Sequence, residues 1–127
     1  GTTLYRIPGV EAIDIPSGMP DKAVLDVVER VVGANNDGAR QNRWKGQWRM
    51  ENRDPANKWI QTGFSVREHY MCVCYRIEGG RLIPDVPRST NLKQNGCSIH
   101  RKVPVWINGI RPQIAQGLYE ASKGTSK

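Results

Sequence analysis

Residues 60–67 and 71–77 alternate between a mainly apolar set and a mainly polar or small set of side chains, and this pattern constrains the fold more than any other feature. Period-two alternation places the two sets on opposite faces of an extended chain. The pattern therefore predicts two neighbouring β-strands of an antiparallel sheet that buries one face and exposes the other.

Further strands are predicted on both sides of this pair. The same kind of pattern predicts strands at residues 10–15, 47–51 and 81–86. Gly79-Gly80 is a strong signal for a tight hairpin turn into the last of these strands. Pro84 has no backbone N–H, so we expect it to confine that strand to a sheet edge or to cut it short.

Two segments have the 3.6-residue period of amphipathic helices. The first, residues 21–32, follows a proline suited to a helix start and precedes Gly33, which is placed to end it. The apolar stripe of this helix consists of Val24, Val27, Val28 and Val31. The second stripe consists of Trp106, Ile110, Ile114 and Leu118. We expect the second helix to begin at Pro104 and to be kinked or divided at Gly109 and Pro112.

The chain of 127 residues is the length of one domain. The element order β-α-β-β-β-β-α predicts an α+β fold, in which both helices pack on one face of an antiparallel sheet of three to four strands. We expect the domain to span residues 10–121, with an irregular segment at 1–9 and a frayed tail at 122–127.

The net charge of +7, from 19 Lys and Arg against 12 Asp and Glu, favours anionic partners, although solubility alone also explains it. The predicted polar face of the sheet carries three arginines and a tryptophan, beside the cysteines at 72 and 74. We therefore take as candidate ligand-binding residues Arg49, Arg67, Arg76 and Trp59.

A second cationic cluster lies earlier in the chain, where tryptophans interleave with basic residues. Its members are Arg40, Arg43, Trp44, Lys45 and Arg53, together with Trp48 and Arg49. Interleaved cations and aromatic rings are typical of platforms for single-stranded nucleic acid. The same composition suits anionic sugars or lipid headgroups, and the tryptophans could instead anchor the segment in the core. Nucleic-acid binding is therefore the alternative function.

The three cysteines match neither a disulfide framework nor a standard zinc site. Cys72 and Cys74 share one face of a strand, about 6.5–7 Å apart between Cα atoms, which is a poor span for a disulfide. A bond from one of them to Cys97 and a buried thiol at one position both remain open. No phosphate-binding or dinucleotide glycine motif occurs, and we expect no metal and no cofactor.

His69 and His100, with a cation nearby, could form an acid/base pair for phosphodiester cleavage, because one imidazole can accept a proton while the other donates one. Nothing in the sequence brings the two rings together. A structural role for His100, bonded to carbonyl groups near a polar turn, is the simpler interpretation. We expect the protein not to be an enzyme, with a small hydrolase as the least favoured alternative.

Three short motifs recur in this order in a family of small bacterial envelope lipoproteins, which the chain resembles over most of its length after residue 13. They are Ser89-Thr90-Asn91-Leu92, Ile99-His100 and Trp106-Ile107. The chain departs from the pattern at Val103 or Val105, where an aromatic residue is common, and at Pro112. The resemblance implies an α+β domain in the periplasm and supplies no catalytic residue, since the family has no established biochemical activity.

The resemblance also implies a location and partners. Any membrane association would come from a lipid-bearing cysteine upstream of Gly1, because no run of this sequence approaches the ~18 apolar residues of a spanning helix. We expect a non-enzymatic domain that binds or scaffolds at the envelope, either in the periplasm or anchored at the outer membrane as a lipoprotein. Its expected partner is an anionic envelope component or another envelope protein.

Overall fold

The computed structural model describes residues 4–6, 9–35, 46–66, 69–87 and 97–125. The two helices are α1 (Asp21–Ala34) and α2 (Cys97–Thr125). The strands are β1 (Leu4–Arg6), β2 (Ile13–Asp14), β3 (Gln47–Arg53), β4 (Trp59–Val66), β5 (His69–Glu78) and β6 (Arg81–Pro87).

The strands form one antiparallel sheet in the order β1-β6-β5-β4-β3, and β2 also pairs with β6. Strands β3 to β6 follow one another along the chain and across the sheet, so local hairpins build most of it. Gly79 and Gly80 have φ angles of 59° and 75° in the turn between β5 and β6. Glycine adopts this region without steric cost, which explains the tight turn.

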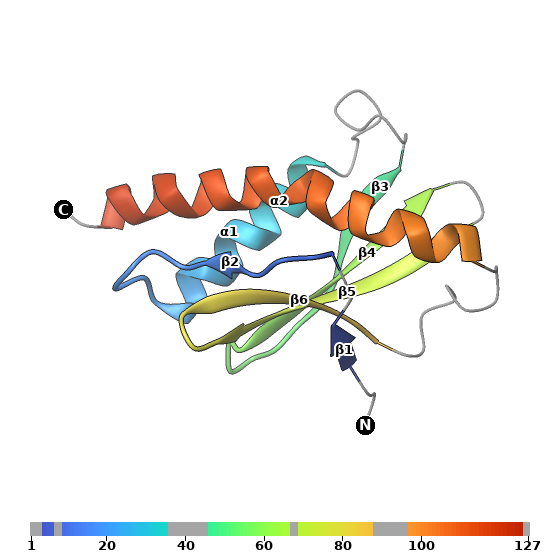
Figure 1. Ribbon diagram of the computed structural model, residues 1–127. Helices are drawn as coiled ribbons and strands as arrows, with labels where there is room; N and C mark the ends of the chain where they lie inside the picture. The colour runs from blue at the N-terminus through green and yellow to red at the C-terminus, as the bar shows by residue number, and fades with distance from the viewer. Residues whose placement is uncertain (1–3, 7–8, 36–45, 67–68, 88–96, 126–127) are drawn as a thin grey trace.

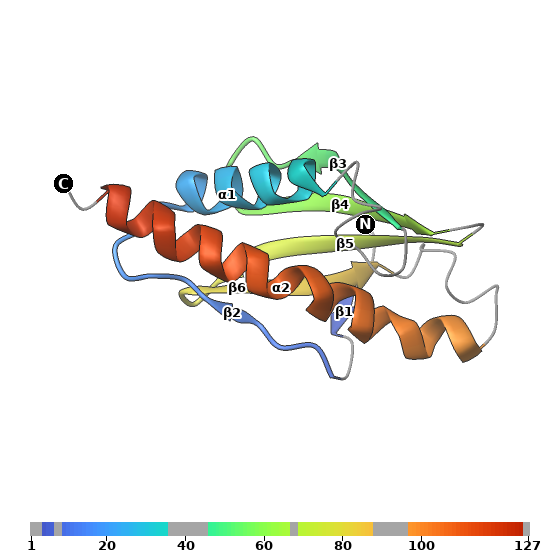
Figure 2. The ribbon, with the colours of Figure 1, turned by 90° about the horizontal axis from the view of Figure 1, so that it is seen from above.

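Both helices lie on the same face of the sheet, so the domain has two layers (Figure 1). Seen from above, α1 runs roughly along the direction of β4, and α2 runs obliquely beside it (Figure 2). The alternate strand residues that face the helices form the core with the helix stripes. This core includes Trp48, Ile60, Phe64, Met71, Val73, Tyr75, Val24, Val28, Trp106, Ile110, Ile114 and Leu118.

Three aromatic rings meet at the centre of the core. The Phe64 ring lies 4.8 Å from that of Trp48 and 5.2 Å from that of Trp106, both tilted, which is a favourable geometry for aromatic pairs. Phe64 is 1% exposed, and its contact with Trp106 of α2 links the helix layer to the sheet. A strand tryptophan and a helix tryptophan are thus fixed by one side chain.

The two helices approach closely at Gly117. A Cβ atom built at this position would lie 2.8 Å from Cγ1 of Val27, which is shorter than real contacts allow. The missing side chain therefore lets α2 pack against the valine stripe of α1. The buried amide of Asn35, which follows α1, also links the helices by donating to Oε1 of Gln113 at 2.9 Å.

The predicted α+β class is confirmed, with two helices on one face of an antiparallel sheet. The sheet contains the short strands β1 and β2 in addition to the expected three to four strands. The segment 1–9 is therefore not irregular throughout, because Leu4–Arg6 pairs with the end of β6. Only Ile13–Asp14 of the predicted strand at 10–15 is a strand, and α1 continues through Gly33.

The predicted start of the second helix and its predicted division into two helices were wrong. It begins at Cys97, seven residues before Pro104, and it continues through Pro112 to Thr125 as one helix. Pro112 is exposed, and the carbonyl group left without its usual partner there can turn outward to water. A helix can therefore tolerate proline on its solvent side without being divided.

The expectation for Pro84 was also wrong, because β6 is not an edge strand. It pairs with β5 on one side and with both β1 and β2 on the other. However, β2 pairs with positions 81 and 82, and β1 pairs with positions 85 to 87. Pro84 lies in the gap between these two short strands, where no ladder bond requires its missing N–H.

Candidate functional site

The outer face of the sheet, defined as the face turned away from both helices, is the candidate site. Its positions follow from the strand register: Arg49 lies opposite Gly63, which lies opposite Cys72, and Trp59 lies opposite Arg76. These residues alternate with the core residues of the same strands. The structure thus brings together Arg49, Arg76, Trp59, Cys72 and Cys74 on one face, as the alternation predicted.

A cluster of polar side chains surrounds the carboxylate of Glu51 on this face. Oε1 accepts from Nε2 of Gln61 at 3.2 Å and from Sγ of Cys72 at 3.3 Å. Oε2 accepts from the Tyr70 hydroxyl and from Nε of Arg49 at 3.4 Å. We call the four donors, Arg49, Gln61, Tyr70 and Cys72, the donor cradle.

The electrostatics of the cluster follow from these contacts. Partial burial alone would raise the pKa of Glu51, but hydrogen bonds from Tyr70, Gln61 and Cys72 outweigh it and hold the pKa below its ordinary value. Burial raises the pKa of the Cys72 thiol, and burial followed by the neighbouring thiol and carboxylate raises that of Tyr70. The cluster is therefore a carboxylate held by neutral donors and one arginine at neutral pH.

Arg76 lies on the same face but is held in an ion-pair network. Its Nε contacts Oδ2 of Asp85 at 2.5 Å and its Nη1 contacts Glu78 at 3.0 Å. Asp85 is 2% exposed, so the guanidinium compensates a buried carboxylate. Cys74, opposite Asp85 in the register, is also buried, and burial raises the pKa of its thiol to about 11. Arg76 therefore has a structural role that limits its use in binding.

Arg53, a member of the alternative cationic patch, faces α1 instead of the outer face. Its Nη1 contacts Asp26 at 2.8 Å and Glu29 at 2.9 Å, and its Nη2 donates to the Lys22 carbonyl. Trp48 of the same segment is 2% exposed in the core, so its ring is not accessible to a stacking base. These two residues serve packing between α1 and the sheet.

Several predicted residues lie outside the described part of the chain. They are Arg40, Arg43, Trp44, Lys45 and Arg67, and also the side chains of His69, Cys97 and His100. The nucleic-acid patch and the histidine pair therefore stay predictions, whereas neither Cys72 nor Cys74 forms the expected bond to Cys97. Cys72 and Cys74 are both thiols.

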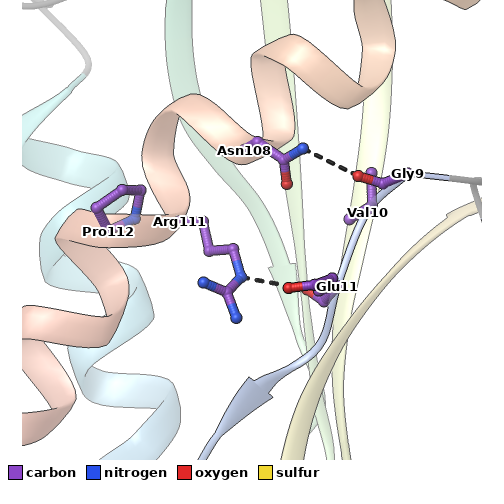
Figure 3. Close-up of a pocket in the computed structure, with 6 residues that line it drawn as sticks. All are labelled: Gly9, Val10, Glu11, Asn108, Arg111 and Pro112. Atoms are coloured by element: carbon purple, nitrogen blue, oxygen red, sulfur yellow. Dashed lines mark hydrogen bonds between the residues drawn. The ribbon is translucent and has the colours of Figure 1, made fainter.

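A pocket of about 470 Å³ lies between α2 and the segment before β2 (Figure 3). In it, Nδ2 of Asn108 donates to the Gly9 carbonyl at 3.0 Å, and Nη2 of Arg111 donates to the Ala12 carbonyl at 2.9 Å. Arg111 also reaches the Glu11 carbonyl through Nε at 3.4 Å. These polar groups replace strand pairing for the segment, so we interpret them as structural.

Glu51, Gln61 and Tyr70 were not singled out from the sequence. Glu51 belongs to a β-bulge, because the register shifts between Met50 and Asn52, and period-two alternation carries no signal for an extra residue. The only available hint was Gly63, since a glycine inside a strand often marks a close approach.

Among the described residues, no three His, Cys, Asp or Glu side chains are grouped so that they could hold a metal ion. No helix in the described part of the chain is both long and apolar enough to cross a membrane. No protein-family model, curated protein or solved structure matches the chain.

Proposed function

We propose that the protein is a non-enzymatic binding domain of the bacterial envelope that holds an anionic polymer against the outer face of its sheet. The observation that carries the proposal is the layering: both helices cover one face, so among the described elements no helix covers the polar outer face (Figures 1 and 2). The periplasmic location, and the relationship to envelope lipoproteins, rest on the sequence resemblance.

Charge supports an anionic partner. The chain carries a surplus of seven positive charges, and Arg49 is an exposed cation of the outer face. Its side chain is 54% exposed, and its contact with Glu51 is 3.4 Å long. An exposed ion pair of this kind contributes at most about 1 kcal/mol, so a polyanion can compete for the guanidinium.

The thiol chemistry favours binding over catalysis. A nucleophilic cysteine needs a pKa lowered by nearby cations or dipoles. On the outer face, burial instead raises the pKa of both Cys72 and Cys74. We therefore assign these thiols to hydrogen bonding and packing in the proposed function.

The test is retention on immobilised alginate, measured as the NaCl concentration at elution. Arg49→Gln removes one positive charge from the outer face, and Arg53→Gln removes one from the α1 side as a matched control. We expect Arg49→Gln to elute earlier than both the wild type and Arg53→Gln, with circular dichroism confirming the fold. Equal elution of the two variants would show that retention follows net charge and not the outer face.

A further inference from the structure

The carboxylate of Glu51 is bound as a ligand would be. Each of its oxygens accepts two hydrogen bonds, and the four donors come from β3, β4 and β5. A carboxylate has about four lone-pair sites, so the donor cradle satisfies the group fully. The Glu51 side chain is 19% exposed, although its strand is an edge of the described sheet.

Two backbone features make room for this carboxylate. The bulge between Met50 and Asn52 adds Glu51 as an extra residue, and bulges re-aim side chains. Opposite it, Gly63 has no side chain, and a Cβ atom there would lie 2.6 Å from Oε2 of Glu51 and 3.0 Å from Cε1 of Tyr70. The carboxylate therefore lies against the backbone of Gly63, and the missing side chain leaves space for a planar group of this size.

We propose that the donor cradle is a binding site for a carboxylate group of the anionic polymer, and that Glu51 occupies it as an internal competitor. This inference rests on the proposed function and names the ligand group. A ligand carboxylate would accept the same hydrogen bonds from Gln61, Tyr70 and Cys72 and the same charge-assisted bond from Arg49. Glu51 would then turn into solvent, since no described strand lies beyond β3.

Competition of this kind weakens the apparent affinity of the wild type. The apparent dissociation constant is the intrinsic one divided by the fraction of molecules in which the site is open. If the Glu51 carboxylate leaves the cradle about a tenth of the time or less, its removal strengthens binding about tenfold or more.

The experiment compares Glu51→Ala with Glu78→Ala by calorimetric titration with oligogalacturonate. Both substitutions remove one carboxylate paired with an arginine of the outer face, because Glu78 contacts Arg76 at 3.0 Å. Only Glu51→Ala opens the cradle. We expect about tenfold tighter binding for Glu51→Ala and a much smaller change for Glu78→Ala. Adding Gln61→Ala to Glu51→Ala should remove part of this gain, because a neutral donor is then lost.

A second measurement tests the donor cradle without relying on affinity. In the Glu51→Ala variant, saturating oligogalacturonate should slow alkylation of Cys72 by iodoacetamide, as followed by peptide mass spectrometry, whereas dextran at equal concentration should not. The proposed role of the donor cradle would be overturned if Glu51→Ala and Glu78→Ala increased the affinity for oligogalacturonate equally. It would also be overturned if the ligand did not protect Cys72 from alkylation. The proposed function would then still be judged by the alginate elution of Arg49→Gln against Arg53→Gln.

Discussion

Replacing Gly117 with alanine is expected to weaken the contact between α1 and α2, whereas the same change at Gly109 should strengthen α2. A Cβ at position 117 would lie 2.8 Å from Cγ1 of Val27 and 3.4 Å from Cγ2 of Val31, and at position 109 it would meet nothing within 4 Å. Both substitutions gain about 1 kcal/mol of helix propensity. At 117, overpacking opposes this gain by about 1–3 kcal/mol, because valine is stiff at χ1 and Val27 is buried.

The two variants should therefore differ by about 1–3 kcal/mol in the free energy of unfolding. Urea titration followed by tryptophan fluorescence measures both values against the wild type. Val27→Ala removes the methyl groups that the new Cβ would meet, so the double variant should show a favourable interaction energy between the two sites. If Gly117→Ala proves as stable as Gly109→Ala, the close approach of the helices is refuted.

Three further predictions concern the core, a thiol and the pocket. Phe64→Ala should lower the free energy of unfolding by about 3–5 kcal/mol and shift the fluorescence of the two tryptophans it contacts, as a urea titration will show. The folded state raises the pKa of Cys74 to about 11, so its contribution to stability is fully present below about pH 9 and is lost as the pH rises to about 11. Between about pH 9 and pH 11, the free energy of unfolding measured by chemical denaturation should fall less steeply for Cys74→Ala than for the wild type. Parallel pH dependences of the two proteins would refute the raised pKa of Cys74. Arg111→Met removes the donors to two backbone carbonyls and should destabilise by about 1 kcal/mol. Hydrogen exchange in residues 9–15 should then become faster, and unchanged exchange would show that the guanidinium does not hold this segment.

The sequence predicted those parts of the fold that depend on local pattern. The valine stripe of α1 and the alternation in β4 and β5 determine which side is buried, so these elements and the two layers could be recognised directly. β1 could not, because three residues become a strand only by pairing with β6, some 80 positions later in the chain. The continuity of α2 through Pro112 depends likewise on solvent exposure, which the sequence does not report.

The same distinction applies to the candidate site. The shared face of Arg49 and Arg76 follows from counting alternate residues, and this much was predictable. The ion pairs that occupy Arg76 and Arg53 depend on which carboxylates the register and the helix bring near. The position of Glu51 depends on a bulge, and a single extra residue changes the facing of a side chain without any change in composition.

The bulge has a further consequence for the behaviour of the protein in concentrated solution. β3 is the last strand on its side of the described sheet, and a regular edge strand offers a row of backbone groups to any other extended chain. The irregularity at Met50 and Asn52 interrupts that row near its middle. Another copy that tried to extend the sheet at β3 would lose register after a few residues, so the bulge protects this edge from fibre-like self-association.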